Sequence, residues 1–218
     1  MTKRILIAVA AVLLVIGVVH QTSAISNAAR LRSKIATALE LKKIQGKGDA
    51  IYWNEQADHY LHEGPITKAF ECFEKGIAFD PTEAAIYQNL GTALFLYRKD
   101  AAKYYNLDEQ QVYDRVFELY EQAMKQDQDN FALATDIAMT YYGIKPQRPE
   151  QALRAWRVAL KLAPSGVERE GIFIHLARTE INAGFYGAAR QSLVEVEDPA
   201  YAEMKEVLTR RVREALGQ

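Results

Sequence analysis

The stretch AIYWNEQADHYLHEGPITKAFECFEKGIAFDP, residues 50–81, decides the fold. Two triplets of residues recur in it at intervals of three and four, the spacing of one face of an α-helix. The triplets are Trp53, Ala57, Tyr60 and Ala69, Phe73, Gly76. Large rings alternate with small residues, so two helix backbones can approach closely. Gly64 separates the triplets and Pro81 ends the stretch, which therefore predicts a helical hairpin.

This pattern resembles the tetratricopeptide repeat, a helical hairpin of about 34 residues. The residues that match the repeat are Trp53, Ala57, Tyr60, Gly64, Ala69, Phe73, Gly76 and Pro81. One hairpin cannot cover its own apolar faces, so we expect further copies to stack against it. The resemblance implies an all-α solenoid of about four hairpins that serves as a protein-interaction scaffold.

The expected repeat region covers residues 49–197. We expect its four copies at about residues 50–83, 84–130, 131–166 and 167–197. The small residues that should bring paired helices together are Ala57, Gly91, Ala138 and Ala177. Copies two and four depart from the repeat pattern at Gln128 and near Tyr201, where the family has Pro.

The second copy also contains about thirteen extra residues between its helices, near residues 98–110. The insert contains neither Gly nor Pro, so we expect it to lengthen the first helix and to turn at Asn106. Glu109 is then expected to complete the cap of the second helix. In the same way, Asp80 is expected to cap the helix that follows it, the first helix of the second copy, with Glu83 at the third position of that helix.

Residues 198–218 predict a last helix that covers the open end of the stack. Its expected apolar side carries Tyr201, Met204, Leu208, Val212 and Leu216. Its other side carries Lys205, Glu206, Arg210, Arg211, Arg213 and Glu214. A helix with one apolar and one charged face suits a position between the core and solvent.

The N-terminus predicts a membrane segment, an N-terminal hydrophobic helix within residues 1–25. Lys3 and Arg4 precede fifteen residues, 5–19, that have no polar side chain. As a helix, these fifteen residues would rise only about 22 Å, less than a hydrocarbon core of about 30 Å, whereas continuation to residue 25 gives about 31 Å. We expect an uncleaved signal-anchor in which residues 5–25 contact the membrane. A cleaved signal peptide is the alternative, with a cleavage site near residues 22–24.

Residues 26–48 are expected to form a helical stalk or linker between this segment and the repeats. Residues 1–48 hold eight basic residues and one acidic residue, a net charge of +7, which leaves 19 basic and 27 acidic residues, a net of -8, in the remainder. An acidic body is a poor ligand for nucleic acid, because phosphate binding needs clustered Lys and Arg. The only cysteine, Cys72, excludes an intrachain disulfide.

No motif in the sequence predicts catalysis or a cofactor. His59 and His62 lie three residues apart next to Asp58 and Glu63, whereas zinc proteases require two His four apart around a Glu. A third converging ligand is missing, so we expect ordinary surface residues and no metal. An enzyme or metal-binding protein that uses His59 and His62 is the third interpretation.

The resemblance implies a concave groove lined by the first helix of each hairpin. The matching positions here are Asn54, Asp58, Gln88, Thr92, Thr135, Met139, Ile174 and Arg178. One turn further along lie Leu61, Phe95, Tyr142 and Ile181. Polar residues followed by apolar ones would suit an extended segment or an amphipathic helix of a partner protein. The alternative is that the second set packs against neighbouring hairpins.

Some repeat proteins hold the acidic tails of heat-shock chaperones with two Lys, two Asn and one Arg in this groove. The corresponding residues here are Asn54, Asp58, Asn89, Ala132 and Asp136. Only Asn89 agrees, and two acidic residues would repel a carboxylate, so we do not expect this partner. We expect a non-catalytic scaffold or adaptor at the cell envelope, single-pass in the inner membrane, with its repeats outside the cytoplasm. A soluble periplasmic adaptor is the alternative.

Overall fold

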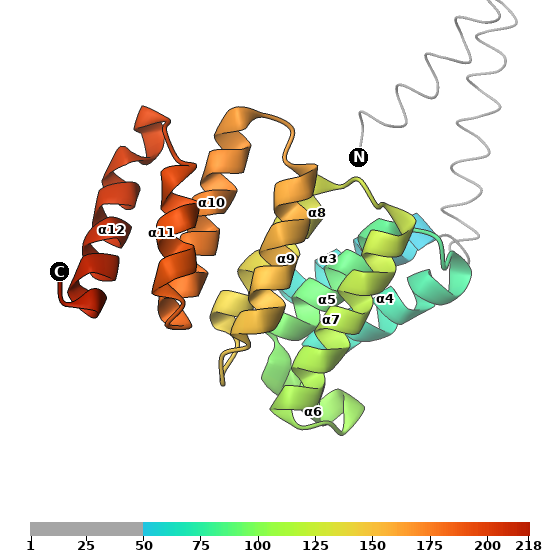
Figure 1. Cartoon of the computed structure of the whole chain (residues 1–218). Helices are drawn as coiled ribbons and strands as arrows, with labels where there is room; N and C mark the ends of the chain where they lie inside the picture. Colours follow the sequence, from blue (N-terminus) through green and yellow to red (C-terminus); the bar gives the residue numbers. More distant parts are fainter. Residues whose placement is uncertain (1–49) are drawn as a thin grey trace, which may run out of the picture.

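The computed structural model describes residues 50–218. The predicted membrane segment (1–25) and stalk (26–48) lie outside this part. All regular elements within it are helices (Figure 1), which confirms the all-α prediction. In chain order they are α3 (Ala50–Glu63), α4 (Ile66–Phe79), α5 (Ala84–Leu96), α6 (Arg98–Tyr105), α7 (Glu109–Gln126), α8 (Phe131–Thr140), η1 (Tyr141–Gly143), α9 (Pro149–Leu162), α10 (Gly166–Asn182), α11 (Tyr186–Val194), η2 (Pro199–Tyr201) and α12 (Ala202–Leu216). Among these helices, none combines the length and the apolar character that a membrane span requires.

The helices pair as hairpins that stand side by side (Figure 1). The pairs are α3 with α4, α5 with α7, α8 with α9, and α10 with α11. Successive hairpins touch through α4 and α5, through α7 and α8, and through α9 and α10, and α12 packs on α10 and α11. The chain thus forms an elongated array that starts at the hairpin α3–α4 and ends at α12.

Small residues allow the helices of each hairpin to approach, as the sequence predicts. Ala57, Ala138 and Ala177 have no exposed surface, and Gly91 is buried. A Cβ atom added to Gly91 would lie 2.8 Å from Cε1 of Tyr120, so the α7 ring lies directly against the α5 backbone.

The insert of the second copy forms a separate helix, which corrects the prediction of a longer first helix. The first helix ends at Leu96, and α6 then packs against α4. The hydroxyls of Tyr104 and Tyr105 donate hydrogen bonds to Glu74 of α4, at 3.1 and 2.8 Å. The turn at Asn106 is confirmed, with φ of 52° in the left-handed region.

Two predicted helix caps were placed on the wrong residue. Asp108 caps α7, with reciprocal hydrogen bonds to Gln111, while Glu109 forms an ion pair with Arg98 at 2.7 Å. Likewise Glu83 rather than Asp80 caps α5. The Asp80 carboxylate instead accepts hydrogen bonds from the backbone and hydroxyl of Thr82, because an aspartate readily closes a turn two residues on.

Only part of the predicted apolar side of the last helix is buried. Residues 199–201 form η2, and α12 follows. Leu208 and Val212 are buried, whereas Met204 and Leu216 are exposed. The predicted apolar face of this helix therefore covers the core through its central turns.

The buried core of the array divides at the contact between α7 and α8, which we call the seam. One apolar cluster extends from Ala50 to Tyr120, and the next begins at Ala134. Within residues 50–218, these two clusters share no buried residue, and they are connected only by partly buried side chains such as Ile137 of α8 on the first and Met124 of α7 on the other. The stacked rings of Phe117 and Tyr141, 4.2 Å apart, cross the seam together with hydrogen bonds.

Candidate protein-docking groove

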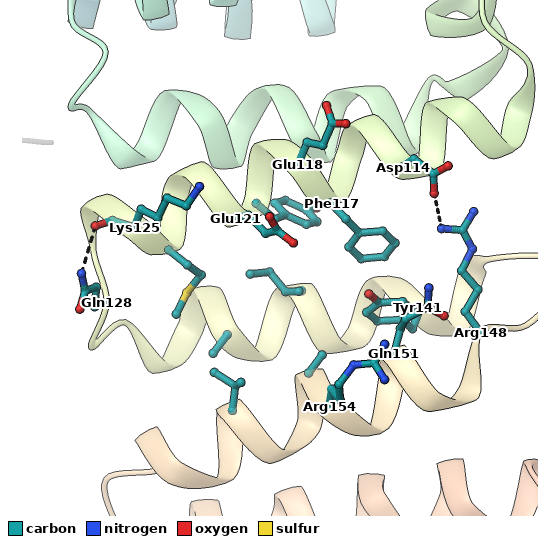
Figure 2. Close-up of a pocket in the computed structure, with 16 residues that line it drawn as sticks. Asp114, Phe117, Glu118, Glu121, Lys125, Gln128, Tyr141, Arg148, Gln151 and Arg154 are labelled. Carbon is teal, nitrogen blue, oxygen red and sulfur yellow. Dashed lines mark hydrogen bonds and ion pairs between the residues drawn. The ribbon is translucent and has the colours of Figure 1, made fainter.

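A groove of about 760 Å³ opens at the seam, with α7 and α9 as its walls and α8 as its floor (Figure 2). Its lining residues recur on each helix at intervals of three and four, so each helix turns one face toward the groove. From α7 and its end come Asp114, Phe117, Glu118, Tyr120, Glu121, Met124, Lys125 and Gln128. From the other elements come Ala134, Ile137, Tyr141, Arg148, Gln151, Arg154, Ala155 and Val158.

The centre of the groove is apolar. Phe117 and Tyr141 stack with an angle of 13° between their rings, and Ile137 lies half-buried on α8. Val158 on α9 is 43% exposed. Burial raises the pKa of Tyr141 to about 12, so its phenol remains neutral near pH 7.

The two walls carry opposite charges. Asp114, Glu118, Glu121 and Lys125 line the α7 wall, a net charge of -2, and Arg148 and Arg154 line the α9 side, a net charge of +2. An ion pair between Asp114 and Arg148 bridges the walls at one end (Figure 2).

The charges of this groove differ in whether they already form ion pairs. Glu118 pairs with Arg115 at 2.9 Å. Within residues 50–218, Glu121 and Arg154 form neither a hydrogen bond nor an ion pair. The groove thus offers the carboxylate of Glu121 and the guanidinium of Arg154 on opposite walls, with the ammonium of Lys125 four residues after Glu121 on α7.

None of the twelve predicted groove residues lines this site. The polar residues among them instead connect neighbouring first helices. Asn89 donates a hydrogen bond to Asn54 at 2.9 Å, and Gln88 donates one to Asp136 at 3.0 Å. Thr92 bonds the Tyr120 hydroxyl at 3.1 Å. These hydrogen bonds connect α5 with α3, α8 and α7, so part of the hydrogen-bonding capacity of these side chains is already used.

The predicted apolar row packs between hairpins. Ile181 is buried in the last core cluster, and so is Ile174. Leu61 and Phe95 pack against the first cluster. The Tyr142 hydroxyl lies 3.2 Å from Nδ1 of His175. Leu61, Phe95 and Tyr142 are half-buried and Ile181 is buried, which favours the alternative interpretation that these residues pack against neighbouring helices.

The remaining predicted positions differ in exposure. Thr135 donates its hydroxyl hydrogen bond to the carbonyl of Phe131, one turn earlier on α8. Met139 is 45% exposed and Arg178 is half-buried. Asp58 is exposed on α3.

The two histidines of α3 each approach a single carboxylate. His59 lies 3.8 Å from Glu63, and His62 lies 3.7 Å from Asp58. Over residues 50–218, no group of three or more His, Cys, Asp or Glu converges as metal ligands would.

The rings of Tyr142, Trp156 and His175 form a cluster between the third and fourth hairpins. The rings of Trp156 and His175 stack 4.4 Å apart at an angle of 3°. Burial, followed by the charge of Arg178, lowers the pKa of His175 to about 4.

This pKa predicts a loss of stability in acid. The folded state favours neutral His175, so its contribution is present above about pH 6.5 and is lost as the pH falls toward about 4. After discount for partial exposure, we expect a loss on the order of 2 kcal/mol over this window. The measurement is the urea midpoint at several pH values for the wild type and His175→Gln. Equal pH slopes for the two proteins would contradict this assignment.

One feature of the sequence indicates the position of the groove. Gln128, where the repeat family has Pro, lies at the α7 end and lines the site. The departure from the repeat pattern thus marks the seam. The sequence did not show that the lining would come from second helices, because that depends on how far α9 stands from α7.

Two solved structures of MamA resemble this fold. One has a TM-score of 0.51 and 14% identity, and the match covers 86% of this chain and 86% of that one. The other has a TM-score of 0.49 and 14% identity, with 82% and 84% covered. The first likeness shows a shared helical architecture. No protein-family model matches the chain. A search of curated proteins also found no match.

Proposed function

We propose that this protein is a non-catalytic scaffold that binds a partner protein in the groove between α7 and α9. The observation that carries the proposal is an open apolar groove with unengaged Glu121 and Arg154 on opposite walls. Apolar surface with a few placed polar groups is typical of a binding site. The stacked hairpin architecture supports the same role, because such arrays present extended binding surfaces.

The groove is a better docking surface than the face of the first helices. On that face Asn54, Asn89, Gln88 and Asp136 already bond to one another. A partner would have to break these bonds before it formed its own, which reduces the net gain. In the groove, Val158 is exposed, and Glu121 and Arg154 form no such bonds within residues 50–218. A partner can therefore contact them without breaking existing bonds.

The proposal places the scaffold at the cell envelope, in the inner membrane, with the repeats outside the cytoplasm. The apolar residues 5–19 behind Lys3 and Arg4 support an uncleaved anchor. The mass of the mature protein distinguishes the anchor from the periplasmic adaptor. A chain that begins at Ile25 would contradict the anchor and favour the adaptor.

Site-specific photocrosslinking tests the docking function. A benzophenone amino acid at Val158 is expected to crosslink one defined protein in intact cells. The same amino acid at Val194, which is 65% exposed on α11 outside the groove, serves as the matched control. Ile137→Glu puts a charge on the half-buried apolar floor and should reduce the Val158 product several-fold.

Two outcomes would contradict docking in the groove. One is an equal pattern of products from Val158 and Val194. The other is a Val158 product that Ile137→Glu leaves unchanged while circular dichroism shows native helix content.

A further inference from the structure

We propose that the occupant of the groove is an amphipathic helix with basic residues on one flank of its apolar face and acidic residues on the other. This inference rests on the proposed function and names the class of partner for the same site. The acidic α7 wall would receive the basic flank, and the α9 side would receive the acidic flank.

The groove suits a helix better than an extended strand. A strand gains affinity when it adds to a sheet edge, whereas the walls here are helices whose backbone groups are already bonded. An extended segment over an apolar floor would leave its own N–H and C=O groups without partners. A helix satisfies its backbone internally, so it can bury an apolar face in such a site.

The length and floor of the groove match a short helix. The lining of α7 extends from Asp114 to Gln128, about 21 Å at 1.5 Å per residue. Such a length accommodates about four turns of a second helix. The lining combines small Ala134 and Ala155 with large Phe117 and Tyr141, and such an uneven surface can be filled by the side chains of a helix.

The charges of the two walls determine which charge each flank of the bound helix should carry. Arg115 engages Glu118, and Asp114 engages Arg148, so Glu121, Lys125 and Arg154 are the charges available to a partner. The α7 wall keeps a net negative charge, because three carboxylates there outnumber one ammonium. A helix with the same sign on both flanks would meet a like charge on one wall, which reduces its affinity. The two signs also set the direction of the helix, because reversal of the helix exchanges its flanks.

The same charges disfavour other occupants. Residues 26–45 of this chain hold five basic residues and one acidic residue. They would complement the α7 wall but would meet Arg148 and Arg154 on the other side. A phosphate surface, of lipid or nucleic acid, would meet Asp114, Glu118 and Glu121.

The test compares binding of four labelled peptides to the purified protein by fluorescence anisotropy. Three are designed helices of about 16 residues, roughly four turns, with one common apolar face. Their flanks are one basic and one acidic, both basic, or both acidic. The fourth peptide is residues 26–45 of this chain. We expect the mixed peptide to bind about three- to tenfold more tightly than each of the others.

Charge reversal gives a sharper readout than affinity alone. Glu121→Arg leaves unpaired charges of positive sign on both walls, because Asp114 and Glu118 are already paired, and should shift the preference to the acidic peptide. Arg154→Glu should shift it to the basic peptide. The double variant exchanges the signs of the charges at positions 121 and 154. It should restore the preference for the mixed peptide, which would then bind in the opposite direction. Both side chains are exposed, so neither change should affect folding.

The outcomes separate this inference from the proposed function. Equal affinity for the three designed peptides, together with a groove-dependent Val158 crosslink, would overturn the helix proposal and leave the docking function. Tightest binding of residues 26–45 would assign the groove to the chain's own segment and would also overturn it. Absence of both peptide binding and the crosslink would overturn both proposals.

Discussion

Replacement of Trp156 by alanine is expected to reduce the free energy of unfolding by about 3–5 kcal/mol. The Trp156 side chain has no exposed surface. Its ring stacks on His175 and packs against Tyr142, and it belongs to the cluster that joins α8, α9 and α10. The loss would therefore leave a cavity where two hairpins meet. The measurement is urea denaturation followed by circular dichroism.

Two control variants isolate the cause. Trp156→Phe keeps an aromatic ring and removes the indole N–H, which lacks a hydrogen-bond partner within residues 50–218. It should therefore cost much less than alanine. Trp53→Ala removes a partly exposed ring that lies under the ammonium of Lys75, and should also cost less. A Trp156→Ala loss no larger than that of Trp53→Ala would contradict a buried anchor.

Replacement of Gly91 by valine is expected to destabilise the protein by about 2–3 kcal/mol. Even a Cβ there would lie 2.8 Å from Cε1 and 3.0 Å from Cδ1 of Tyr120, and 3.4 Å from the carbonyl oxygen of Val116. The Tyr120 ring cannot readily retreat, because its hydroxyl bonds Thr92 at 3.1 Å and Thr140 at 3.5 Å. The variant must push α5 and α7 apart.

Gly187 on α11 provides the matched control. No atom lies within 4 Å of a Cβ added there, so Gly187→Val should change stability by less than about 0.5 kcal/mol. Thermal and urea unfolding of both variants would measure the difference. Similar losses for the two would show that helix propensity, not contact with Tyr120, governs the effect.

Local patterns in the sequence predicted the hairpins well. Ala57 and Ala177 are buried as expected, because a small residue between two facing helices is a strict packing requirement. The turn at Asn106 was also predictable, since Asn tolerates left-handed backbone. The caps were less certain, since Asp108 and Glu109 are adjacent and equally able to begin a helix.

The binding surface was much harder to predict. The repeat pattern identifies which face of a first helix turns away from its partner. It does not show that Gln88 would bond Asp136, or that Ile181 would be buried in the last core cluster. The groove depends on the spacing of α7 and α9, which arises from many weak contacts around the seam. No short sequence pattern encodes that distance.

The division of the core at the seam has a consequence for heat denaturation. In an array in which each hairpin contacts only its neighbours, cooperativity is interrupted where the coupling is weakest. The first two hairpins and the rest of the chain should then melt as separate blocks. Trp53 lies in the first block and Trp156 in the second, so fluorescence of single-tryptophan variants would follow each transition. A ligand that touches both walls would couple the blocks and merge the two transitions into one.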